Sequence, residues 1–172
     1  QCRICESVFV SSETLPGSDL YTKKYFAAGS GNVLYRRAES CWGEFLQRLK
    51  LKRTPRLPQN AKVLDVGFGS GGWMEFLQKR GFVVHGLDPA ADACAMARQR
   101  DLKEVHCGDL EHHDLKPGSF DAVTANHCLE HCADPGKFIR NATALLKPGG
   151  WLGIAIPNIS SWEARRAREQ WY

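Results

Sequence analysis

The sequence predicts an α/β fold: a Rossmann-like, doubly wound and mostly parallel sheet of about five strands, with helices on both faces. Three observations lead to this prediction. Strand and helix patterns alternate between residues 61 and 158, which implies parallel strands joined by right-handed crossovers. Continuous apolar strands such as Val83-Val84 fit a sheet that is covered on both faces. Polar and glycine residues follow the strands directly, at the sheet edge where such folds bind ligands.

Local signals then place each element in order. Gly81 is well placed to end the first helix of this region, Pro89 lies in the first turn of the second, and Asp134 caps the third with Pro135 at its first position. The expected strands span 62–66, 82–87, 103–107, 120–125 and 151–156. The expected helices span 73–80, 89–100 and 135–146, with turns at 67–72 and 148–150.

The chain divides into two parts, an N-terminal segment 1–60 and a domain 61–172. The N-terminal segment has a helical pattern from about 33 to 51, after which Pro55 and Pro58 interrupt the chain. Residues 161–172 are expected to form a helix or the start of a crossover.

Composition excludes several classes of protein. The 172 residues suit one domain, and the 43% apolar content is sufficient for a core. No apolar run is long enough to cross a membrane, and the net charge of +4 is spread along the chain, so we expect neither a membrane nor a nucleic-acid partner. The seven cysteines are odd in number and irregular in spacing, which favours reduced thiols in a cytoplasmic protein.

The segment 65–72, with the sequence DVGFGSGG, is the strongest candidate site. It follows a strand and opens a helix, and its glycines allow a tight turn and the close approach of a ligand. Gly67, Gly69 and Gly72 also match the dinucleotide-binding pattern. Asp88, at the end of the second strand, can accept hydrogen bonds from both ribose hydroxyls of an adenosine cofactor, or it can simply cap the next helix.

Other residues favour S-adenosylmethionine (SAM) over a nicotinamide cofactor. Asp65 lies two positions before the first glycine, a spacing typical of SAM enzymes. Asp109, after the third strand, can accept a hydrogen bond from an adenine amino group while Leu110 packs on the ring, although Asp109 can also be a turn residue. A run of polar residues, 126–131, follows the fourth strand.

With these residues in place, the sequence resembles the class I SAM-dependent methyltransferases that act on small molecules. The resemblance implies that the loop 65–71, and in it Asp65, Gly67, Phe68, Gly69 and Gly71, holds the methionine end of SAM. It also implies that Asp88 with Pro89 binds the ribose, that Asp109 with Leu110 binds the adenine, and that Asn126 lies at the cofactor. The matching segments are VLDVGFGSG (63–71), GLDPA (86–90), GDL (108–110), FDAV (120–123), LEHCADP (129–135) and LLKPGGWL (145–152).

A finer resemblance concerns the N-terminal end of the chain, whereas the C-terminal end departs from the family. Cys2 and Cys5 resemble the second knuckle of a zinc ribbon that precedes the domain in one subgroup, so they form at most half a zinc site, and we predict no other metal. Tyr21 and Tyr25 match aromatic residues that fold over SAM in that subgroup. The full family fold has two more strands after the fifth, so the domain is expected to be truncated before them.

The implied reaction is methyl transfer from SAM to an oxygen, nitrogen or carbon atom of a small molecule. His127 and His131 lie where the acceptor should meet the methyl group, and either could act as the general base. A metal held by His127, Glu130 and His131 is an alternative. Two other functions stay open at this point: a SAM-binding module without turnover, and an NAD-dependent oxidoreductase.

Overall fold

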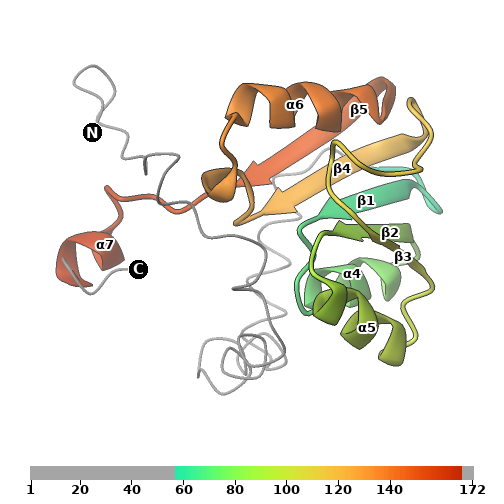
Figure 1. Cartoon of the computed structure of the whole chain (residues 1–172), viewed down its shortest axis with the longest axis horizontal. Helices are drawn as coiled ribbons and strands as arrows, with labels where there is room; N and C mark the ends of the chain where they lie inside the picture. Colours follow the sequence, from blue (N-terminus) through green and yellow to red (C-terminus); the bar gives the residue numbers. More distant parts are fainter. Residues whose placement is uncertain (1–56, 168–172) are drawn as a thin grey trace.

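The computed structural model describes residues 57–167, and a five-stranded parallel sheet lies at its centre (Figure 1). The strand order is β3-β2-β1-β4-β5, so the direction of winding reverses between β1 and β4. This confirms the predicted fold class, and it places the ligand-binding edge at the carboxyl ends of β1 and β4. The strands are β1 (Lys62–Val66), β2 (Val83–Asp88), β3 (Glu104–Cys107), β4 (Phe120–Asn126) and β5 (Leu146–Ala155).

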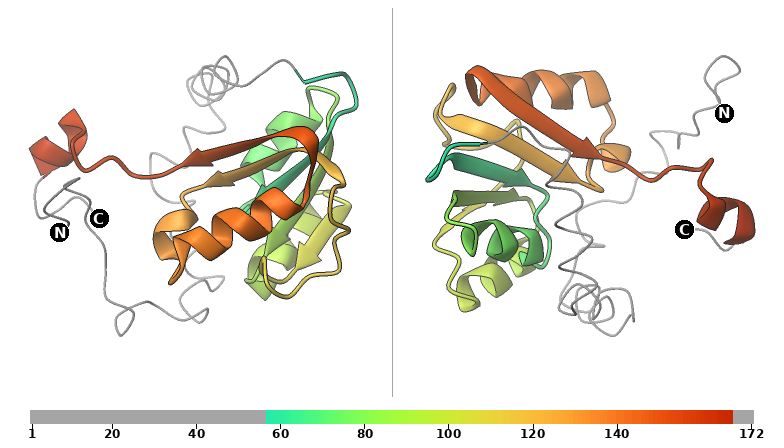
Figure 2. Two further views of the ribbon diagram at one scale, coloured as in Figure 1. Left: turned by 90° about the horizontal axis from the view of Figure 1, so that it is seen from above. Right: turned by 180° about the vertical axis from the view of Figure 1, so that it is seen from behind.

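Helices cover both faces of the sheet. The helices α4 and α5 lie on one face and α6 lies on the other, as the view from above shows (Figure 2). This two-sided cover explains the continuous apolar strands: Leu64 and Val66 belong to the core under α6, and Val63 belongs to the opposite one. The helices are α4 (Gly72–Gln78), α5 (Ala91–Gln99), α6 (Pro135–Ala144) and α7 (Trp162–Ala167), with a 3₁₀ turn η4 (Leu129–His131).

The residues predicted to begin α6 and to end α4 are confirmed. The Asp134 carboxylate accepts a hydrogen bond from Lys137 N at 2.8 Å and so caps α6. Gly81, with φ of +84°, follows the last turn of α4. The helix α5 starts two residues later than predicted, because Ala90 is still extended, with ψ of 111°.

The last strand differs from its prediction. We expected residues 148–150 to form a turn outside the sheet, but β5 already begins at Leu146. Leu146 pairs with Phe120 and Trp151 pairs with Ala122, so the residues between them bulge out opposite Asp121. The Lys147 ammonium, in this bulge, lies 2.7 Å from the Asp121 carboxylate.

Two of the cysteines that we expect to be reduced lie side by side. Cys94 of α5 and Cys107, the last residue of β3, are placed so that their sulfurs can pair as a disulfide. Because α5 packs on the sheet beside β3, the two Cα atoms lie 6.1 Å apart, a separation that a disulfide can bridge. Counting cysteines along the chain cannot reveal this proximity. Cys128 and Cys132 are free thiols.

Several predictions fall outside the described residues. They are the N-terminal segment up to residue 56 with its expected helix, the half zinc site at Cys2 and Cys5, and the aromatic pair Tyr21 and Tyr25. Among residues 57–167, no helix is both long enough and apolar enough to cross a bilayer.

Candidate cofactor-binding site at the ends of β1, β2 and β4

The loop between β1 and α4 has a backbone that requires glycine. Gly67, Gly69 and Gly71 have φ angles of +68°, +54° and +79°. L-residues with a side chain rarely adopt this left-handed region. Gly67 N also donates to Leu87 O at 2.8 Å, so the loop stays attached to the end of β2 as it turns away from β1.

Close packing adds a second requirement for glycine. A Cβ atom on Gly67 would lie 2.8 Å from the Cys128 sulfur, and one on Gly71 would lie 2.7 Å from Leu102 Cδ1. Real Cβ atoms do not approach their neighbours so closely. Cys128 follows β4, so the glycine loop and the segment after β4 are in direct contact at the point where the strand order reverses.

Asp88 connects the end of β2 to this loop. Its carboxylate is 6% exposed and accepts hydrogen bonds from Gly69 N and Ala90 N, each at 2.9 Å. Burial raises the pKa of Asp88, and these two hydrogen bonds partly offset the effect. The carboxylate therefore organises the loop and also satisfies a backbone N–H group just before α5. Each oxygen keeps a lone pair for a further donor such as a ribose hydroxyl.

Asp65 is held from β4, an arrangement that sequence reasoning missed. Its carboxylate is 2% exposed and accepts a hydrogen bond from the Thr124 hydroxyl at 2.7 Å. The Trp73 indole N–H of α4 in turn donates to Thr124 Oγ1 at 3.3 Å. Thr124 lies 59 positions after Asp65, so no local sequence pattern predicts the contact. The available signal was the single threonine in the otherwise apolar part of β4, which could have been predicted to pair with the acid at the end of β1.

Neighbouring strands stay connected just beyond their carboxyl ends. Past the last paired residues, Gly108 N donates to Asp88 O at 3.0 Å and His127 N donates to Ala155 O at 2.8 Å. The pKa of Cys128 is raised by a hydrogen bond with Cys132, by burial, and by the negative charges of Asp88 and Asp65.

The segment after β4 carries the two predicted bases. His127 has a φ of +53°, which is rare for a residue with a side chain and typical of functional loops. Its imidazole is 51% exposed, and its Nδ1 lies 3.4 Å from Glu130 Oε1. The other carboxylate oxygen, Glu130 Oε2, is buried without a hydrogen-bond partner. His131 is exposed in η4, and Asn126 is the last residue of β4.

The side chains of the alternative metal site after β4 do not lie close together. Among the described residues, the one group of three or more potential ligands that lie close together is elsewhere, on β2 and β3. His127, Glu130 and His131 therefore do not form a three-ligand site in this structure.

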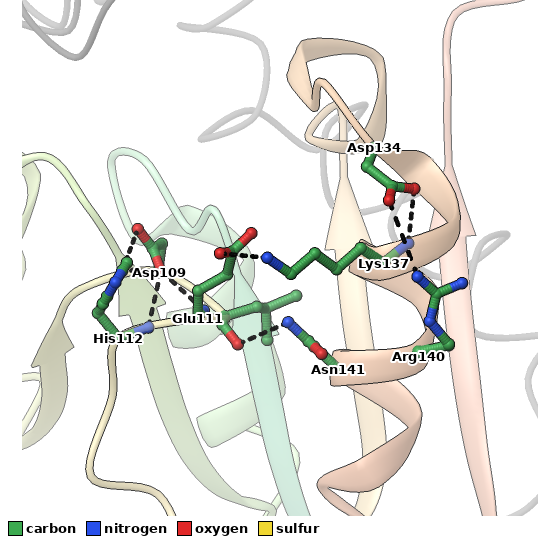
Figure 3. A network of polar contacts seen from close by, with 8 residues as sticks. Asp109, Glu111, His112, Asp134, Lys137, Arg140 and Asn141 are labelled. Carbon is green, nitrogen blue, oxygen red and sulfur yellow. Dashed lines mark hydrogen bonds and ion pairs between the residues drawn. The ribbon is translucent and has the colours of Figure 1, made fainter.

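Asp109 is engaged in its own turn (Figure 3). Its carboxylate accepts hydrogen bonds from Glu111 N at 2.7 Å and from His112 N at 2.8 Å. Its partial burial works in the opposite direction, but these bonds and the His112 imidazole lower the pKa of Asp109. The turn role is thus present, and a role toward adenine stays a prediction.

Helix α6 holds the same turn from the other side. Lys137 Nζ lies 2.6 Å from Glu111 Oε2, and Asn141 Nδ2 donates to Leu110 O at 3.0 Å (Figure 3). The Leu110 side chain is 7% exposed and packs in the core under α6. Phe68 is likewise buried, in the core on the opposite face. Contacts of Leu110 and Phe68 with a cofactor stay predictions, as does that of Pro89.

Comparison with known proteins agrees with this geometry. A family model described as "Methyltransferase domain" matches residues 35–172. A ubiquinone biosynthesis O-methyltransferase of Chromobacterium violaceum is 39% identical over 105 residues, which are 56% of this chain and 44% of the relative. One of Sodalis glossinidius is 39% identical over 94 residues, 51% of this chain and 38% of the relative. The chain spans less than half the length of these curated relatives.

Solved structures share the fold. Phosphoethanolamine N-methyltransferase 2 of Haemonchus contortus, in complex with S-adenosylhomocysteine, has a TM-score of 0.68 at 26% identity, and the match covers 88% of this chain and 38% of that one. The (4+2)-cyclase SpnF has a TM-score of 0.57 at 28% identity, over 64% of this chain and 44% of that one. On the family match and the fold, the chain belongs to the methyltransferase domain family, within the class I SAM-dependent methyltransferases.

Proposed function

We propose that this chain binds SAM at the β1–α4 loop and contributes to methyl transfer onto a hydroxyl group of a small molecule. The observation that carries the proposal is the buried Asp88 carboxylate, which bonds the glycine loop through Gly69 N. The site thus has an acceptor for ribose hydroxyls directly beside a glycine-rich loop.

The residues present fit the cofactor. Gly67, Gly69 and Gly71 have positive φ angles, and these tight turns let the backbone of the loop face a ligand closely. Asp65 supplies negative charge at the end of β1, where a methionine ammonium group would gain from it. Asp109, in the turn after β3, has a second oxygen that contacts only His112 among the contacts described, and this oxygen can accept from an adenine amino group.

Bound SAM supplies a methyl group on a positively charged sulfur, which makes the sulfur a good leaving group. The task of the chain is then to position the acceptor and to remove its proton. His127 suits the second task, because its exposed imidazole lies next to Glu130, whose carboxylate can orient the ring. His131 is the second candidate for the base.

The choice of a hydroxyl acceptor rests on the relatives. Curated relatives that match at 33–39% identity include ubiquinone biosynthesis O-methyltransferases of several bacteria. The structural relatives include an N-methyltransferase and a cyclase, so the fold alone does not select the acceptor atom. A cytoplasmic location stays a prediction.

Titration calorimetry tests the cofactor proposal directly. We expect SAM and S-adenosylhomocysteine to bind and NAD not to bind. Asp88→Asn should weaken SAM binding at least tenfold, about 1.4 kcal/mol, because a neutral amide accepts weaker hydrogen bonds from the ribose. The matched control is Asp101→Asn, which removes the same charge from an exposed residue after α5. Equal SAM affinity in both variants would show that Asp88 only organises the loop.

A second measurement separates an enzyme from a binding module. The wild-type chain and His127→Gln are incubated with SAM and a quinol, the hydroxyl-bearing reduced form of a quinone, and methylated product is measured by mass spectrometry. Product formation that falls in His127→Gln with unchanged SAM affinity supports the base role. SAM binding without any product supports the module without turnover.

A further inference from the structure

A second cluster of ligand-type side chains lies away from the cofactor loop, on the neighbouring strands β2 and β3. His85 belongs to β2, and Glu104 and His106 belong to β3. In the register of the sheet His85 pairs with Glu104, and Leu87 pairs with His106, so alternate positions bring the three side chains to one face. One ligand atom from each residue lies within 4.8 Å of the other two.

We propose that His85, Glu104 and His106 form a site for a divalent transition-metal ion such as Zn²⁺. This inference does not depend on the proposed methyl transfer. Two imidazoles and one carboxylate are a ligand set that Zn²⁺ prefers, and a water molecule can complete a tetrahedral arrangement.

The distances agree with tetrahedral coordination. Metal–ligand bonds of about 2.0–2.1 Å place neighbouring ligand atoms about 3.3–3.4 Å apart. His85 Nδ1 lies 3.3 Å from His106 Nε2 and 3.7 Å from Glu104 Oε2. Shifts of a few tenths of an ångström, within the freedom of the Glu104 side chain, which is 55% exposed, complete the arrangement.

The surroundings hold both imidazoles in place. The Asp114 carboxylate lies 3.4 Å from His106 Nδ1, which leaves Nε2 to face His85 and Glu104. A carboxylate on the far nitrogen of a metal-binding histidine is the usual way of orienting such a ring. The ring of Phe120 meets the His85 ring edge-on, at 5.3 Å between centroids.

The charge state of His85 suits a ligand. Burial first, and then the positive charge of Lys62, lower the pKa of His85 to about 4. A direct hydrogen bond between the two imidazoles uses the same nitrogen atoms, so the experiment must separate a histidine pair from a metal site.

Calorimetry with Zn²⁺ on the full chain makes this separation. We expect the wild-type chain to bind one Zn²⁺ ion at this site. In His106→Asn and in Glu104→Gln the Zn²⁺ affinity of the site should fall at least tenfold, so that this equivalent is lost from the titration. The matched controls are His113→Asn and Glu111→Gln, which should keep the equivalent. Glu104 is exposed, so Glu104→Gln carries the test even if His106→Asn does not fold. Equal binding in wild type and Glu104→Gln overturns the proposal.

Co²⁺ as a second probe identifies the ligands. Nitrogen and oxygen ligands give the visible d–d bands of Co²⁺ without a thiolate charge-transfer band, whereas cysteine ligation gives both. We expect the d–d bands to decrease in Glu104→Gln and to stay in Glu111→Gln. Spectra that show thiolate ligation alone place the metal on the cysteines and refute the site on β2 and β3.

Discussion

Replacement of Gly67 by alanine tests whether the glycine loop and the segment after β4 are packed as the structure shows. Gly67 has a φ of +68°, and an alanine in this left-handed region costs about 1–2 kcal/mol. The added methyl group would also lie 2.8 Å from the Cys128 sulfur and 3.2 Å from its Cβ atom. Moving a packed side chain out of the way costs about 1–3 kcal/mol more.

Gly81 provides a matched control. Its φ of +84° imposes a similar backbone cost on alanine, but a Cβ atom there meets nothing within 4 Å. We therefore expect Gly67→Ala to lower the free energy of unfolding by about 2–5 kcal/mol and Gly81→Ala by about 1–2 kcal/mol, as measured by urea denaturation. If the proposed function holds, SAM affinity falls at least tenfold in Gly67→Ala and is unchanged in Gly81→Ala.

The double variant Gly67→Ala/Cys128→Ala isolates the contact. Cys128→Ala removes the sulfur and with it the shortest contact. In the Cys128→Ala background, the loss of unfolding free energy caused by Gly67→Ala should therefore fall to nearly that caused by Gly81→Ala in the wild type. Equal destabilisation by Gly67→Ala and Gly81→Ala, together with unchanged SAM affinity, refutes the close packing at the end of β1.

Two further predictions concern interactions between strands. Thr124→Val keeps the shape of the side chain but removes the buried hydrogen bond to Asp65, so the free energy of unfolding should fall by about 1–3 kcal/mol, whereas the exposed Thr143→Val should change it by less than about 0.5 kcal/mol. At Asp121, the hydrogen bond from Lys147 holds the pKa below its usual value of 3.8, so the carboxylate stabilises the fold above the unfolded pKa and loses this effect as the pH falls through the folded pKa. Asp121→Asn should therefore destabilise the protein by about 0.5–1 kcal/mol at neutral pH, and urea denaturation at decreasing pH should show the difference disappear. A difference that persists in acid would contradict the assigned ion pair.

Short-range sequence patterns made much of the fold and of the candidate site predictable. The order of strands and helices follows from apolar patterns and helix-end signals, which are short-range properties of the chain. The glycine loop follows from the same kind of signal, because positive φ angles at Gly67, Gly69 and Gly71 strongly favour glycine wherever the rest of the chain lies. The carboxylate of Asp88 was placed at the ligand edge because parallel strands end on the same side.

The sequence by itself thus determined the fold class, the glycine loop and the acids at the strand ends. Only the tertiary structure decided which side chains meet across strands: Thr124 with Asp65 at 59 positions, His85 with His106 at 21, and Cys94 with Cys107 at 13. The physical reason is that backbone preferences act within a few residues. Contacts between side chains depend on the strand order and on the register, and a shift of one residue would turn His85 to the other face.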